Sequence, residues 1–161
     1  MTTTITQRSA LMVVFIVSLL TIIGAFLFQW AGYAPCHLCL MQRWAYYFAV
    51  PFSLLLSVSA GGNPKGAELG LYLLAVVMLG SAVFGAYHAG VEWSWWPGPE
   101  TCSGAISGGL PDLTKPVVAC NEAAIRIAGI SLAGWNAIIS VALAAIALAG
   151  ARHQGSSSVS Q

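Results

Sequence analysis

The feature that most constrains the fold of this chain is a stretch without charged side chains that extends from Arg8 to Arg43. A helix that crosses the hydrocarbon core of a bilayer needs about 20 apolar residues. Charged residues make up 7% of the 161 residues, whereas soluble proteins carry about 25%. Because a soluble fold of this length needs more charge to cover its surface, the sequence predicts a membrane protein.

Four apolar stretches predict an all-α membrane protein, a four-transmembrane-helix bundle with a longer outer loop between helices 3 and 4. The expected spans are residues 9–28, 44–58, 69–89 and 128–150, and the expected outer loops are residues 30–43 and 90–127. We expect the first stretch to be a retained span, because it is longer than the apolar region of a signal peptide. Residues 1–150 then form a single membrane domain, and the polar residues 151–161 form a disordered tail.

The four cysteines lie in the two expected outer loops, with Cys36 and Cys39 in one and Cys102 and Cys120 in the other. With four spans, these two loops share one side of the membrane. The lysines and arginines divide equally between the two sides, so the positive-inside rule does not choose between them. Because disulfides persist in oxidising compartments, we expect periplasmic cysteine loops and cytoplasmic termini.

All six tryptophans also fall near the expected cysteine face. Aromatic belts normally occupy both membrane interfaces. The bias indicates either a one-sided anchor or an aromatic surface that receives a partner or a flat ligand, and both interpretations stay open.

The spacing of Cys36 and Cys39 lets the start of a helix hold both sulfurs within bonding distance. It suits a dithiol–disulfide switch, and it also suits half of a zinc site, although Cys102 and Cys120 do not form the second close pair that such a site needs. A purely structural disulfide explains the distant pair but not the close pair, since a short loop restrains little of the unfolded chain. Pro35 favours a helix that begins near Cys36, where the helix dipole makes thiols reactive.

Arg43 lies four residues after Cys39, so the two side chains share one face of a helix. An arginine at the centre of a membrane helix costs about 2.5–3.5 kcal/mol, and less near an end. Either the side chain extends to the interface, or it neutralises a thiolate on Cys39 or an anionic reduced ligand beside it. The residues alone leave both interpretations open.

Residues 117–127, "VVACNEAAIRI", also have two interpretations. As a helix on the membrane surface they would place Cys120 on an apolar side, close to the bilayer. Eleven residues are few for an isolated helix, so an irregular loop is the alternative.

These features together resemble the DsbB family of bacterial disulfide-bond formation proteins. The resemblance lies in the four spans, the Pro-Cys-x-x-Cys at the head of the second span, the arginine four residues on, and two cysteines in the second outer loop. Two further stretches carry it, "YHAGVEWSWWPGPETC" after the third span and "CNEAAIRIAGISLAGWNAIIS" before the fourth. It implies an inner-membrane enzyme, a protein-dithiol:quinone oxidoreductase that reoxidises the periplasmic thioredoxin-fold protein DsbA and passes electrons to ubiquinone or menaquinone.

The resemblance also implies roles for the cysteines. Cys36 and Cys39 correspond to the redox disulfide that is coupled to the quinone. Cys102 and Cys120 correspond to the redox disulfide that meets DsbA. We expect exchange between the two pairs to leave Cys39 as the thiolate beside the quinone.

Two further residues match positions at the family's quinone site. Arg43 matches the family's arginine there, and His88 falls where the family has a histidine near the quinone. The implied partners are a DsbA-like protein, a membrane quinone and the lipid bilayer. No metal is expected, and the six lysines and arginines form no basic face for nucleic acid.

Other classes of protein remain as alternatives. A DsbD-type reductase passes electrons in the opposite direction, but such chains are longer and have more spans. The vitamin K epoxide reductase group also joins a CxxC pair to quinones, but there the pair lies late in the chain. In the third alternative, the chain is a small structural membrane protein whose outer-loop disulfides only stabilise it.

Overall fold

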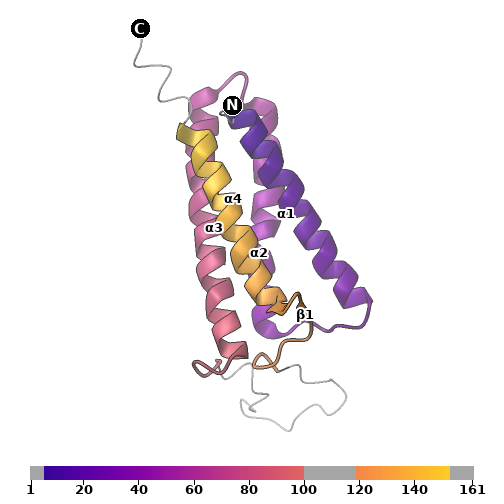
Figure 1. Cartoon of the computed structure of the whole chain (residues 1–161). Coiled ribbons are helices and arrows are strands. Elements are labelled where there is room, and N and C mark those ends of the chain that lie inside the picture. Colours follow the sequence, from indigo (N-terminus) through magenta and orange to yellow (C-terminus); the bar gives the residue numbers. More distant parts are fainter. Residues whose placement is uncertain (1–5, 100–118, 153–161) are drawn as a thin grey trace, which may run out of the picture.

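The computed structural model of this chain describes residues 6–99 and 119–152, and within them it forms four helices and one short two-stranded ribbon. These elements are α1 (Gln7–Trp30), α2 (His37–Ser59), α3 (Pro64–Glu92), β1 (Arg126–Ile127), β2 (Ile130–Ser131) and α4 (Leu132–Arg152). Successive helices run in opposite directions (Figure 1). The start of α2, the end of α3 and the start of α4 therefore meet at one end of the bundle, and the predicted helical fold is confirmed.

Three of the four helices, α1, α3 and α4, are long and apolar enough to cross a membrane. The remaining helix, α2, has 23 residues and a less apolar composition. It contains the whole expected second span, residues 44–58, and it begins at His37, inside the expected outer loop 30–43. The first outer connection is therefore shorter than predicted, and Cys39 lies on a helix.

Side chains at the helix starts explain where the first three helices begin. The side-chain oxygens of Thr6 and Asn63 accept backbone N–H groups from the first turns of α1 and α3. The sulfur of Cys36 does the same for α2, where it accepts the N–H of Cys39 at 3.2 Å. Such caps satisfy N–H groups that have no partner within the helix. The start of α2 thus holds one of the predicted redox sulfurs in place.

The segment before α4 differs from the expectation. The predicted span began at residue 128, whereas α4 begins at Leu132 because β1 and β2 pair as an antiparallel hairpin. Its two turn residues, Ala128 and Gly129, have φ angles of 52° and 81°, which make a tight turn that no helix can continue through. Residues 119–127 contain no helical residue. The surface-helix interpretation is therefore wrong for the described part of that segment.

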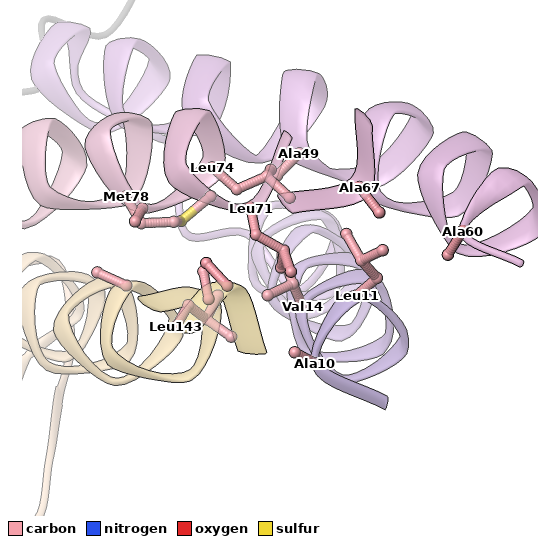
Figure 2. Close-up of a cluster of buried hydrophobic side chains, with 14 of the residues drawn as sticks. Ala10, Leu11, Val14, Ala49, Ala60, Ala67, Leu71, Leu74, Met78 and Leu143 are labelled. Atoms are coloured by element: carbon pink, nitrogen blue, oxygen red, sulfur yellow. The ribbon is translucent and has the colours of Figure 1, made fainter. Parts of the chain in front are cut away.

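The interior of the bundle is made of aliphatic side chains that pack tightly between the helices (Figure 2). Leu11 of α1 and Leu71 of α3 are fully buried. The outward faces are apolar as well: Leu55, Val76 and Val83 are 69%, 66% and 71% exposed. Helices that are hydrophobic all round are typical of membrane spans.

Small residues let α3 and α4 approach each other closely. A Cβ atom on Gly85 would lie 2.8 Å from the Nδ2 atom of Asn136 and 3.1 Å from the carbonyl oxygen of Ala133. Helices in membranes associate through such small residues, because lipid supplies no hydrophobic drive between them.

A buried chain of hydroxyl groups connects three helices. The Tyr46 hydroxyl of α2 lies 2.9 Å from the Ser140 hydroxyl of α4, which donates to the Ser81 hydroxyl of α3 at 3.0 Å. All three side chains are buried. These hydrogen bonds between hydroxyl groups fix the rotation of α2 about its own axis. They therefore fix the direction in which the first turn of α2 presents the thiols.

Candidate functional site

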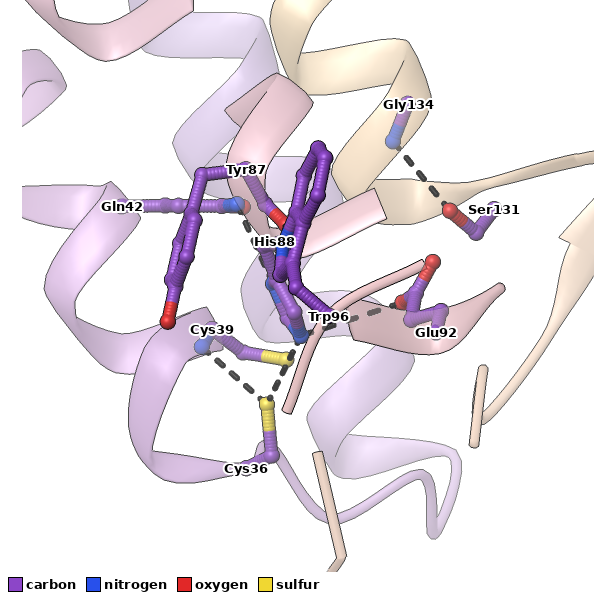
Figure 3. A network of polar contacts seen from close by, with 9 residues as sticks. All are labelled: Cys36, Cys39, Gln42, Tyr87, His88, Glu92, Trp96, Ser131 and Gly134. Atoms are coloured by element: carbon purple, nitrogen blue, oxygen red, sulfur yellow. Dashed lines mark hydrogen bonds and ion pairs between the residues drawn. The ribbon is translucent and has the colours of Figure 1, made fainter. Parts of the chain in front are cut away.

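The predicted redox pair lies at the start of α2, beside the end of α3. Cys36 is buried and Cys39 is partly buried, and both are free thiols in this structure. The Nε2 atom of His88 lies 3.6 Å from the sulfur of Cys36 (Figure 3). The sulfurs of Cys36 and Cys39 and a ring nitrogen of His88 all lie within 4.8 Å of one another. The fold thus brings His88 to the thiols, across 52 residues of sequence.

Gln42 and Glu92 complete the surroundings of His88, and the sequence interpretation missed both. The amide Nε2 of Gln42 lies 3.1 Å from Nδ1 of His88. Because an amide nitrogen donates, Nδ1 accepts, and we assign the ring proton to Nε2. That N–H faces the sulfur of Cys36 and also Oε1 of Glu92, at 3.9 Å. The spacing of Glu92, one turn after His88 on α3, was the sequence signal that could have found it.

Cys36 is the more acidic thiol of the pair. Its pKa falls from 9.0 to about 4. The largest cause is a hydrogen bond from the Cys39 side chain, and His88 and the backbone N–H of Cys39 act in the same direction, while burial opposes them. The pKa is lowered because the capping position directs three donors at the sulfur of Cys36. The expected thiolate on Cys39 belongs to a different state, in which Cys36 is bonded to Cys120, and it stays a prediction.

Arg43 is buried at 9% exposure and faces α1. Its guanidinium donates to the side-chain oxygen of Gln29 at 2.8 Å and to the carbonyl oxygen of Ala25 at 3.3 Å, and it lies 5.1 Å from the ring centroid of Phe26. These partners lie in the last two turns of α1, so both interpretations of Arg43 stay predictions. Acceptors on α1 offset the cost of the buried charge.

A cavity of about 410 Å³ opens beside the thiols, between α1, α2, the hairpin segment and the start of α4. Its walls are mainly apolar, and they include Cys36, Cys39, Arg43 and Glu92. His88 is not among the lining residues; it contacts Cys36 instead. One cavity therefore presents both thiols and a guanidinium to whatever ligand enters it.

Cys120 of the second predicted pair lies beside the first pair. It is fully buried, and it packs in one cluster with Cys36 and Leu38. It is disulfide-bonded, so it offers no thiolate to the four-cysteine zinc site considered above. Its predicted partner, Cys102, lies outside the described residues.

These features define a class of protein: a helical membrane protein with a buried dithiol centre beside an apolar cavity. The model of the family "Disulfide bond formation protein DsbB" matches residues 7–150. The chain belongs to the DsbB family, and this membership implies disulfide bond formation by a thiol oxidoreductase.

Two relatives are consistent with this assignment. The chain is 29% identical to a disulfide bond formation protein B of Albidiferax ferrireducens over 72% of this chain and 70% of that protein. It is 26% identical to an uncharacterized protein of Rickettsia prowazekii over 69% of this chain and 67% of that protein. No solved structure matches the chain.

Proposed function

We propose that this chain is a disulfide-generating membrane oxidoreductase, which reoxidises a DsbA-like periplasmic protein of the thioredoxin fold and passes two electrons to a membrane quinone. One observation carries the proposal. A single apolar cavity is lined by Cys36, Cys39 and Arg43, so a ring in that cavity would contact a dithiol that can give electrons and a cation that can stabilise the product.

The cavity suits a quinone in size and chemistry. Ligand sites in proteins measure about 300–1,000 Å³ and are mostly apolar with a few polar groups, and this cavity is about 410 Å³. A quinone supplies the acceptor for two electrons and two protons. The guanidinium of Arg43 is a fixed donor for negative charge that develops on a quinone oxygen, in a site with little water to weaken the interaction.

The surroundings of Cys36 favour an oxidising pair. A thiolate that is stabilised in the reduced state makes the corresponding disulfide easier to reduce, and therefore a stronger oxidant. DsbA itself stands near −120 mV, so an enzyme that reoxidises it must be more oxidising still or must pass the electrons onward. The low pKa of Cys36 makes the pair more oxidising. The adjoining cavity has room for a quinone that takes the electrons onward.

The second pair is proposed to connect DsbA with the first. A DsbA thiolate attacks the Cys102–Cys120 disulfide at Cys102, which releases Cys120 as a thiolate. Cys120 then attacks Cys36 and opens the Cys36–Cys39 disulfide, which leaves Cys39 as a thiolate. The presence of Cys120 and Cys36 in one buried cluster supports this step. The second cysteine of DsbA displaces Cys102 and completes the DsbA disulfide. Cys102 then attacks Cys120, which restores the Cys102–Cys120 disulfide and releases Cys36.

The membrane arrangement is part of the proposal. Helices α1 to α4 would each cross the bacterial inner membrane within one domain, residues 1–150, followed by the polar tail, residues 151–161. The three apolar helices and the alternating helix directions in Figure 1 support this arrangement. The termini would then face the cytoplasm, and both cysteine loops would face the periplasm.

Anaerobic mixing of the purified chain with reduced DsbA and a quinone tests the function. We expect stoichiometric quinol from the wild-type chain and none from single serine variants at any of the four cysteines. Turnover that survives Cys39→Ser would contradict the mechanism. If the wild-type chain forms no quinol and Cys39→Ser changes only its stability, the structural alternative is correct.

Arg43→Ala tests the quinone site separately. The loss of one charge-assisted hydrogen bond costs about 1.5–3 kcal/mol, so we expect the KM for quinone to rise by about tenfold to a hundredfold. Exposed Arg8 offers the matched control, Arg8→Ala, for which we expect an unchanged KM. An unchanged KM in Arg43→Ala would remove Arg43 from the proposed site.

A further inference from the structure

Glu92 is a buried acid beside the thiols that the exchange reactions leave without a role. Its side chain is 5% exposed. Its Oε2 atom is buried and has no hydrogen-bond partner among the described residues. Because a carboxylate without partners is costly in a protein interior, a buried unsatisfied group in a native fold asks for an explanation. A change in the charge of Glu92 during the reaction is such an explanation.

The geometry connects Glu92 to the thiol pair and to the cavity. Its Oε1 atom lies 3.9 Å from Nε2 of His88, and that same nitrogen lies 3.6 Å from the sulfur of Cys36 (Figure 3). Glu92 also lines the cavity together with Cys36 and Cys39. One N–H of His88 therefore faces two groups that can each hold a negative charge.

We propose that Glu92 and Cys36 hold a single negative charge in turn. Glu92 is protonated while Cys36 is a thiolate, and it is a carboxylate while Cys36 is part of the disulfide. Glu92 thereby stores the proton that Cys36 loses when it ionises, and it releases that proton towards the cavity. This inference rests on the proposed function.

Electrons and protons balance in both directions. When the Cys36–Cys39 bond forms, two electrons leave the sulfurs for the quinone, one proton leaves the Cys39 thiol, and one leaves Glu92; the two protons go to the two quinone oxygens. The negative charge is then on Glu92 instead of Cys36. When a dithiol reduces the disulfide again, its two protons go to Cys39 and Glu92, and Cys36 regains the charge.

The charged groups around Cys36 and Glu92 are consistent with this exchange. The Nε2 atom of His88 lies 3.6 Å from the sulfur of Cys36 and 3.9 Å from Oε1 of Glu92, and negative charges on both of these groups at once would repel each other strongly in a buried environment. Arg43 lies on the wall of the same cavity, and the other acid that lines the cavity, Glu122, is exposed.

Infrared difference spectroscopy of the chain, with a small dithiol as reductant and with neither quinone nor DsbA present, tests the proposal. We expect the carbonyl band of a protonated carboxyl group to appear on reduction. The band should be absent in Glu92→Gln, which keeps the size of the side chain but has no carboxyl group. It should persist in Glu68→Gln, the same substitution at the opposite end of α3. A wild-type chain without the band, or a Glu92→Gln chain that keeps it, overturns the proposal.

Proton counting gives a second measurement. Reduction of the wild-type disulfide by a neutral dithiol should release no net proton to the solution. In Glu92→Gln, either one proton per chain should be released or the Cys36 thiolate should be lost, and quinol formation should slow by about a hundredfold or more, the usual contribution of a positioned proton donor. A wild-type proton count in a variant that keeps the Cys36 thiolate contradicts the exchange.

Different results would contradict the charge exchange and the proposed function. If the wild-type chain reduces quinone but lacks the carboxyl band, the charge exchange is wrong and the proposed function stands. If the band appears but no quinol ever forms, the proposed function is wrong.

Discussion

At the scale of single residues, the arrangement around Cys36 decides what the thiol pair can do. A CxxC motif specifies two sulfurs near a helix start, but it does not specify which is ionised. Here the capping position and the side chains of Cys39 and His88 all act on Cys36. The motif was therefore readable from the sequence, whereas the contribution of His88 to the low pKa of Cys36 was not, because His88 comes from another helix.

A pH titration of the reduced chain tests this assignment. Because the pKa of Cys36 is lowered from 9.0 to about 4, the thiolate should persist as the pH falls from 9 and should be lost only near pH 4. In His88→Phe we expect the midpoint to move upward, towards 9, but not all the way, since the hydrogen bond from Cys39 is the larger cause. Ultraviolet absorbance of the thiolate measures both midpoints.

The matched control for that titration is His37→Phe, because His37 lies in the same motif and is exposed. Its midpoint should equal that of the wild-type chain. Identical curves for His88→Phe and the wild-type chain would show that His88 does not stabilise the thiolate.

At the scale of the helices, small and polar residues set the packing that holds the thiols in place. Apolar side chains alone do not fix how membrane helices rotate about their axes, because lipid is as apolar as the helix surfaces. The hydroxyl chain from Tyr46 to Ser81 and the close approach at Gly85 supply the missing specificity. Neither contact is visible in the sequence, since each joins residues from different helices.

Tyr46→Phe removes the hydroxyl that connects α2 to Ser140. Interhelical hydrogen bonds in membranes contribute about 0.6 kcal/mol on average and up to about 1.7, so we expect the free energy of unfolding in detergent to fall by an amount in that range. Tyr47→Phe is the control, because the adjacent Tyr47 is 41% exposed. Equal stabilities of the two variants would contradict a structural role for the hydroxyl chain.

Gly85→Ala should separate α3 from α4. A methyl group there meets backbone atoms of Ala133 and Ala137 at 3.1 and 3.0 Å, and overpacking of this kind costs about 1–3 kcal/mol. In contrast, Gly80→Ala on the same helix meets nothing within 4 Å and should be neutral or slightly stabilising, since alanine favours helices. Thermal unfolding of both variants in detergent measures the difference; a stable Gly85→Ala chain would show that the close approach is not needed.

At the scale of the whole molecule, the alternating helices bring the start of α2, the end of α3 and the segment around Cys120 to one end of the bundle (Figure 1). The chain thereby assembles a site from residues that are distant in sequence. Helix α2 is long enough to cross a membrane, but its composition is less apolar than that of the other helices. Thus the crossing of α2 is the step on which the proposed topology depends.

Thiol labelling in intact cells tests that topology. A reagent that does not cross membranes should label a cysteine introduced by Gly61→Cys, in the exposed turn between α2 and α3, only after the cells are opened. After reduction, Cys102 should be labelled from outside without opening them. Labelling of position 61 before the cells are opened would contradict a crossing by α2. Labelling of both positions from the same side would exclude a crossing by α3, which lies between them.

The sequence by itself determined the class of this protein, because hydrophobic length and scarcity of charge dictate membrane helices whatever their packing. It also pointed to the thiol pair, because CxxC spacing is a local property of one helix start. Only the tertiary structure decided that His88 contacts Cys36 and lies between Gln42 and Glu92. It also decided that Arg43 faces α1, and that α4 begins only after the hairpin. The physical reason is that these contacts join different helices or depend on backbone turns, and side-chain periodicity within one segment carries no record of them.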